Sequence, residues 1–176
     1  MRSFILLLLV VLNIGYSLGN GLGPTSFYFL PLKAVSIDRD ALAVYAPGGS
    51  VGIHTTDTKK VFLMTWTDCS ITITQQTNDA ITLKSDYGRF VDLAPEGLRK
   101  EITAAMECEK IMKIEVNRAA FPTVVHAARQ IIVCDKLHQL GGGFILTSQG
   151  MFESDGSLIC GEPTAPANLF FPPRRP

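Results

Sequence analysis

Apolar and polar residues alternate along several short segments in the first half of this chain. The clearest alternation runs from Ser70 to Gln75, where Ile71 and Ile73 are separated by threonines, and a period of two is typical of a half-buried β-strand. Apolar runs bounded by glycine, proline, asparagine or aspartate predict further strands, over Ser26–Leu32, Leu42–Ala46, Val61–Trp66, Ala80–Ser85 and Arg89–Leu93. The pattern therefore predicts three strands joined by tight hairpins between positions 70 and 93.

The second half of the chain fits two descriptions. Leu98, Ile102, Ala105, Met106 and Met112 fall near helical spacing. Thr123–Leu140 follows Pro122 and is followed by three consecutive glycines that would end a helix. Against two helices, the segment Ile111–Val116 alternates apolar and charged residues in the manner of an edge strand, and Ile131-Ile132-Val133 is β-branched. Periodicity alone leaves both descriptions open.

An internal repeat favours strands, because a similar pattern occurs three times at a separation of roughly fifty residues. Each copy combines an aromatic residue near a glycine, a glycine-containing turn and an apolar closing strand. The copies occupy residues 45–63, 81–114 and 142–171. Repeats of this length are typical of architectures built from equivalent lobes.

The repeated pattern resembles the β-trefoil fold and, within it, the fascin-like repeats. The likeness is best at Gly88-Arg89-Phe90, and the first copy lacks a Gly-x-aromatic. The resemblance implies an all-β protein, a β-trefoil of three repeats of roughly 45–54 residues. The alternative is an α+β domain with a β-meander and two helices. Fascins bundle actin inside cells, but fold does not by itself transfer function.

The N-terminus predicts secretion. Arg2 precedes an unbroken apolar run from Phe4 to Leu12, which is of signal-peptide length and too short to span a bilayer. Ser17 and Gly19 satisfy the small-x-small requirement of signal peptidase, so we expect cleavage between Gly19 and Asn20. We therefore expect a signal peptide at 1–19 and one domain at 20–176 with a short Pro/Arg-rich tail, secreted and not inserted in a membrane.

Charge and cysteine content refine this picture. Sixteen basic residues balance sixteen acidic ones, which argues against a nucleic-acid or anionic-membrane partner, so we expect neither. An even number of cysteines in a secreted protein predicts disulfides, here two bonds among Cys69, Cys108, Cys134 and Cys160. We favour Cys69 with Cys108 and Cys134 with Cys160, although the sequence leaves the connectivity open.

No residue pattern predicts catalysis or metal binding. The three histidines, His54, His126 and His138, lie in no recognisable motif, and no Gly-x-Ser-x-Gly is present. Cys134 and His138 have a plausible ligand spacing, but no Cys-x-x-Cys accompanies them. We therefore expect a protein that is not an enzyme, with no metal and no cofactor.

The same absence of motifs leaves the ligand-binding residues unknown. Trp66 could stack on a sugar, but its position at the end of an apolar run favours core packing, and the Gln-x-Trp of ricin-like lectins is replaced by Met64-x-Trp66. The expected function is a secreted, non-enzymatic binding module for an extracellular glycan or protein. The alternatives are a structural component of an extracellular or mineralised matrix and a secreted protease inhibitor.

Overall fold

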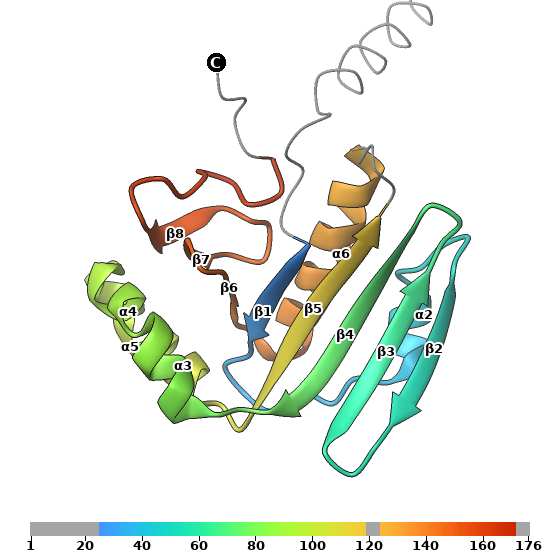
Figure 1. Ribbon diagram of the computed structural model, residues 1–176, viewed down its shortest axis with the longest axis horizontal. Coiled ribbons are helices and arrows are strands. Elements are labelled where there is room, and N and C mark those ends of the chain that lie inside the picture. The colour runs from blue at the N-terminus through green and yellow to red at the C-terminus, as the bar shows by residue number, and fades with distance from the viewer. Residues whose placement is uncertain (1–24, 119–123, 172–176) are drawn as a thin grey trace, which may run out of the picture.

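A single antiparallel sheet of eight strands organises the described chain, in the order β2-β3-β4-β5-β1-β6-β7-β8 (Figure 1). The computed structural model describes residues 25–118 and 124–171. The strands are β1 (Ser26–Leu30), β2 (Ser50–Thr55), β3 (Lys59–Thr65), β4 (Cys69–Thr77), β5 (Lys110–Arg118), β6 (Phe144–Leu146), β7 (Gly150–Phe152) and β8 (Leu158–Gly161). The helices are α2 (Arg39–Ala43), α3 (Ala80–Tyr87), α4 (Arg89–Leu93), α5 (Glu96–Glu107) and α6 (Val124–Gly141).

The strands β2, β3 and β4 form one meander and β6, β7 and β8 form a second, whereas helical excursions precede β5 and β6. Helices α3 to α5 lie between β4 and β5 in the chain, and α6 lies between β5 and β6. The first strand is central, because β1 pairs with β5 on one side and β6 on the other. The expected signal peptide at 1–19 and residues 172–176 of the expected tail lie outside the described residues.

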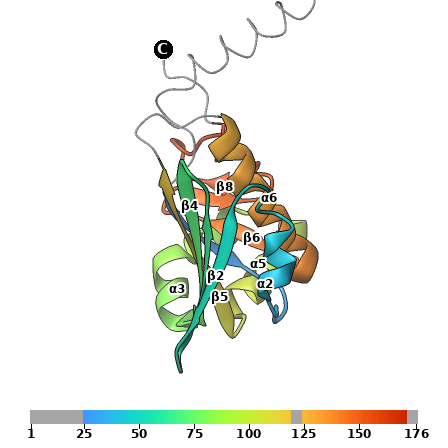
Figure 2. The same ribbon diagram turned by 90° about the vertical axis from the view of Figure 1, so that its right-hand side faces the viewer.

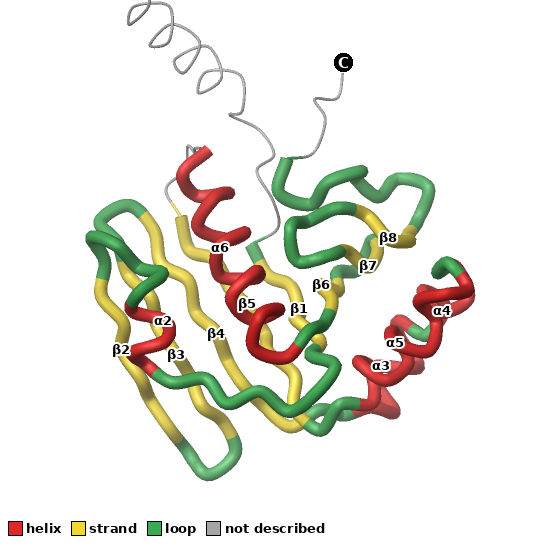
Figure 3. The backbone as a smooth tube through the Cα atoms, turned by 180° about the vertical axis from the view of Figure 1, so that it is seen from behind, coloured by secondary structure: helices red, strands yellow, loops and turns green. Residues whose placement is uncertain are grey.

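Helices α6 and α2 cover one face of the sheet (Figures 2 and 3). Strands β3 and β4 send Phe62, Ile71 and Ile73 into this layer, where α6 contributes Val133 and Leu137. All five side chains are buried. The alternation that predicted β4 therefore separates this core from the opposite face of the sheet.

Helices α3, α4 and α5 pack on the opposite face, against β1 and the three C-terminal strands. This second core joins Phe90 and Ile102 of the helices to Phe144, Leu146 and Met151 of the sheet. The three helices leave the outer face of β3 and β4 uncovered, as the exposure of Leu63 shows. No helix of the described chain is both long enough and apolar enough to span a membrane.

The expected β-trefoil is wrong. The protein is an α+β fold built on one open sheet with five helices in the described residues, so the stated alternative describes it better. Helices α5 and α6 occupy most of the two segments whose spacing indicated helices, but Met112 of the first segment lies in β5. The apparent threefold repeat does not correspond to three equivalent lobes, because its second copy spans helices and its first spans a meander.

Three predicted strands are helical. The segments Leu42–Ala46, Ala80–Ser85 and Arg89–Leu93 lie wholly or partly in α2, α3 and α4. In α3 the apparent alternation is misleading, because Leu83 is buried while Ile81 is 84% exposed. The side chain of Asp79 instead accepts a hydrogen bond from Thr82 N and caps the helix.

Candidate functional site

The turn between β3 and β4 meets the first turn of α6 at one end of the sheet. Trp66 N donates to Cys69 O across 2.8 Å, which places Thr67 and Asp68 at the tip of the turn. The side chain of His126 is buried, and its Nε2 lies 2.9 Å from Asp68 Oδ2. Two segments far apart in the sequence are thus joined by a polar contact.

Arg129 lies one helical turn beyond His126 and contacts three residues of the same hairpin. Its Nη1 donates to Asp68 Oδ1 at 2.7 Å and to Cys69 Sγ at 3.0 Å. Its guanidinium lies 4.7 Å from the centre of the Trp66 ring, within the range of a cation–π interaction. A helix that places His126 and Arg129 at i and i+3 presents both side chains to one neighbour.

The electrostatics of the cluster follow from these contacts. The hydrogen bond from Arg129 lowers the pKa of Asp68 below its ordinary value, with a further contribution from His126. Burial raises the pKa of Cys69 despite the opposing hydrogen bond from Arg129. At neutral pH the site therefore combines a carboxylate, a guanidinium and a protonated thiol.

This arrangement does not match nucleophilic catalysis by cysteine. A catalytic histidine must contact the thiol that it deprotonates, whereas Nε2 of His126 faces Asp68 and the sulfur of Cys69 contacts Arg129. The arrangement does match a donor set for a metal ion. One ligand atom from each of Asp68, Cys69 and His126 lies within 4.8 Å of the other two.

A polar pocket of about 330 Å³ opens beside this cluster. We call it the hairpin pocket, and its walls are Thr65, Trp66, Thr67, Asp68, Cys69, Ser70 and Asn117. Ser70 and Asn117 face each other across β4 and β5 as register partners. Hydroxyl, amide and carboxylate groups from two segments of chain, residues 65–70 and Asn117, therefore converge on one concave surface.

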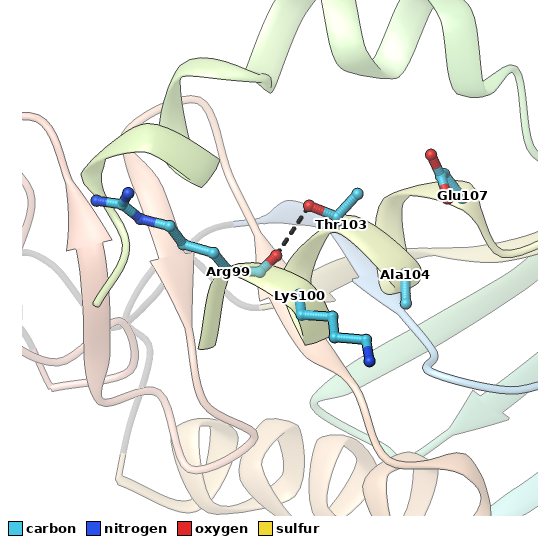
Figure 4. Close-up of a pocket in the computed structure, with 5 residues that line it drawn as sticks. All are labelled: Arg99, Lys100, Thr103, Ala104 and Glu107. Atoms are coloured by element: carbon cyan, nitrogen blue, oxygen red, sulfur yellow. Dashed lines mark hydrogen bonds between the residues drawn. The ribbon is translucent and has the colours of Figure 1, made fainter. Parts of the chain in front are cut away.

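A second hollow, of about 460 Å³, runs along α5 and has a different character. Its walls come from α5 alone (Figure 4), and Arg99 and Glu107 point toward opposite ends of the hollow. Arg99 is engaged by the carbonyls of Ala94 and Asp92, and Glu107 pairs with Lys84. Since its polar groups do not converge, we assign the candidate site to the hairpin pocket.

The two expected disulfides are not formed, because all four cysteines carry free thiols. Cys69 begins β4, and Cys108 precedes the strand residue Lys110, which pairs with Thr77 at the other end of β4. A strand of nine residues separates these ends by about 26 Å. A disulfide needs Cα atoms within about 7 Å, so the preferred pairing of Cys69 with Cys108 is incompatible with this fold.

The second preferred pairing fails for a similar reason. Cys134 of α6 lies in the core on one face of the sheet, whereas Cys160 of β8 lies in the core on the opposite face. The thiol of Cys160 donates to Phe90 O. Burial raises the pKa of both thiols, which is the behaviour of cysteines that serve as small core residues.

The structure separates the other residues that the sequence singled out. Cys134 is buried in α6 while His138 is exposed, so these two do not converge. His54 is exposed in β2. Core packing of Trp66 is confirmed, because its residue is 7% exposed and its Nε1 donates to Pro47 O at 3.2 Å.

Sequence reasoning missed Asp68, Arg129 and Asn117. Each is an ordinary surface residue type, and only the pairing of β4 with β5 and the position of α6 bring them together. The spacing of His126 and Arg129 was a readable signal for one helix face, but it did not identify the hairpin opposite. Comparisons with protein-family models, curated proteins and solved structures found no match for this chain.

Proposed function

We propose that this protein is a secreted, non-enzymatic binding module whose ligand is a carbohydrate held in the hairpin pocket. The observation that carries the proposal is the composition of the pocket wall. Its hydroxyl groups, the Asn117 amide and the Asp68 carboxylate supply both donors and acceptors. Sugar hydroxyls need both, and the pocket volume of about 330 Å³ lies within the size range of small-ligand sites.

Secretion is supported by the apolar run Phe4–Leu12 and the small residues after it. The free thiols are compatible with an oxidising compartment, because Cys69, Cys134 and Cys160 are buried. Buried thiols are protected from oxidation, which requires an accessible thiolate. These three thiols could therefore persist unoxidised in such a compartment.

Binding of the mature chain, residues 20–176, to a broad glycan array tests the proposal. Asn117→Ala and Ser70→Ala remove two facing pocket groups, and we expect each to weaken the selected glycan at least tenfold. Thr74→Ala and Gln76→Ala, farther along β4 on the same face of the sheet, are matched controls that should leave binding unchanged. A blank array, or equal losses in both pairs of variants, would contradict a carbohydrate site in this pocket.

The exposed edge of the sheet favours a second candidate, self-assembly as a matrix component. Among the described strands β2 pairs with β3 alone, and five of its six residues are exposed. An unpaired edge can accept a further strand. Light scattering across a concentration series should then show growth that Ile53→Lys in β2 abolishes and that Ile81→Lys in α3 preserves. A constant monomer mass would remove this candidate.

A further inference from the structure

We infer that Asp68, Cys69 and His126 form a binding site for a divalent transition metal, with Zn²⁺ the best match. This inference is independent of carbohydrate binding, although Asp68 and Cys69 also line the hairpin pocket. The two ligand residues of the turn are adjacent in sequence, and the third reaches them from α6. We call these three residues the Asp68–Cys69–His126 cluster.

The chemistry of the donor set fits zinc. Carboxylate oxygen, thiolate sulfur and imidazole nitrogen are its ordinary protein ligands, and three protein ligands with one open position are typical of accessible zinc sites. Harder cations such as Mg²⁺ and Ca²⁺ prefer all-oxygen surroundings. The sulfur of Cys69 and the nitrogen of His126 therefore favour Zn²⁺, or Co²⁺ as its spectroscopic substitute.

The geometry needs only small adjustments. Metal–ligand distances of about 2.0–2.3 Å in a tetrahedral site imply ligand atoms about 3.3–3.6 Å apart. His126 Nε2 and Asp68 Oδ2 lie 2.9 Å apart, and the sulfur of Cys69 lies within 4.8 Å of both. A modest widening of the first pair and an approach of the sulfur would place all three around one ion.

Arg129 occupies a position suited to orienting these ligands. It donates to Asp68 Oδ1, which leaves Oδ2, the oxygen facing His126, for the metal. It also donates to Cys69 Sγ, which partly offsets the effect of burial on the pKa of this thiol, and binding of the metal would displace the remaining thiol proton to solvent. Outer hydrogen bonds of this kind commonly fix the ligands of metal sites.

The hairpin pocket supplies access and room for a fourth ligand. Asp68 and Cys69 belong to its wall, so an ion between them and His126 would lie at the edge of the pocket. The charges of Zn²⁺ and Arg129 exceed those of the two ionised ligands by one positive unit. The open position should therefore favour water or an anionic group over a cationic one.

Isothermal titration calorimetry of the metal-free mature chain with ZnCl₂ tests the site in the absence of carbohydrate. We expect one Zn²⁺ per chain, and with Co²⁺ an absorption band from the cobalt–thiolate bond. Cys69→Ser and Asp68→Asn should each weaken Zn²⁺ at least a hundredfold, and Cys69→Ser should abolish the thiolate band. Arg129→Gln, which retains all three ligands, should weaken binding about tenfold to a hundredfold.

Cys108→Ser and His138→Gln provide matched controls, since each removes a possible ligand outside the cluster. Circular dichroism identifies variants that remain folded, and only these enter the comparison. If Cys69→Ser or Asp68→Asn unfolds, the site is tested instead by the Zn²⁺ affinity of Arg129→Gln and by the cobalt spectrum of the unmodified chain. Absence of stoichiometric binding, a cobalt complex without a thiolate band, or equal loss in the controls would overturn the site. Glycan binding is measured separately, so failure of either proposal leaves the other testable.

Discussion

The guanidinium of Arg129 lies 4.7 Å from the centre of the Trp66 ring, and the indole Nε1 of Trp66 donates to Pro47 O. Trp66 thus connects α6 to the loop before β2. A Cβ on Gly49 would lie 2.9 Å from the same Nε1, so the loop packs closely against the ring. The side chain of Trp66, a residue of the hairpin pocket, is therefore held on two sides.

We predict an energetic coupling between Arg129 and Trp66. A double-mutant cycle with Arg129→Met and Trp66→Leu should give a coupling free energy of about 0.5–1 kcal/mol, the usual strength of a partly exposed cation–π pair. Urea unfolding of the four proteins measures it. Strict additivity would show that the stacked geometry contributes nothing to the free energy of unfolding.

The free thiols lead to a second prediction. A thiol-specific reagent should count four thiols per unfolded chain, and native protein should react mainly through Cys108, the one cysteine that is not buried. Dithiothreitol should leave the midpoint of thermal unfolding unchanged. A count of zero, or a large loss of stability on reduction, would instead establish disulfides in the purified protein.

Two buried glutamines provide a third, matched prediction. Gln75 Nε2 donates to Val35 O at 2.8 Å, whereas the side-chain amide of Gln130 is buried with no hydrogen-bond partner among the described residues. Burial of an unsatisfied polar group costs about 1–3 kcal/mol. Gln130→Met should therefore raise the free energy of unfolding or leave it unchanged. Gln75→Met should lower the free energy of unfolding by about 1–3 kcal/mol, because it leaves the carbonyl of Val35 without its hydrogen-bond donor.

Chemical denaturation of both variants at neutral pH measures the difference. A clear loss of stability in Gln130→Met would indicate that the amide has a partner, such as an internal water. No loss in Gln75→Met would indicate that its bond to Val35 contributes little.

The sequence pattern correctly predicted the elements in which one face is buried and the other is exposed. Strand β4 follows its period of two, with Ile71 and Ile73 fully buried, and α5 buries Ile102, Ala105 and Met106 as its spacing predicted. The same reasoning failed for α3, since an isolated alternation around Ile81 is too short to distinguish a strand from a helix. The capping interaction of Asp79 with Thr82 was the competing signal.

The candidate site could not be predicted from the sequence, because it depends on the order of the strands in the sheet. Cys69 begins β4 and Arg118 ends β5 as its register partner, so the start of α6 returns to the β3–β4 turn only because β5 lies between β4 and β1. Nothing in the residues around Asp68 or His126 encodes that order of strands. The disulfide prediction failed for the same reason, because cysteine number does not determine which cysteines lie close together.

The cap of α3 yields a prediction for acid conditions. Asp79 accepts hydrogen bonds from the Thr82 hydroxyl at 2.7 Å and the Thr82 backbone amide at 3.2 Å. The hydrogen bond from the Thr82 hydroxyl, and next the one from its backbone amide, lower the pKa of Asp79 below its ordinary value. A carboxylate whose pKa is lowered by folding stabilises the native state above its unfolded pKa, and that contribution disappears as the pH falls through the folded value.

Asp79→Asn isolates this effect, because asparagine also caps helices but does not ionise in this range. Near pH 7 the unmodified chain should be slightly more stable than the variant, and the difference should shrink as the pH falls below 4. Urea unfolding of both proteins at several pH values from 7 to 2 measures it. A difference that is constant with pH would show that the charge of Asp79 plays no part in the cap, and Asp57→Asn in the β2–β3 turn controls for general loss of negative charge.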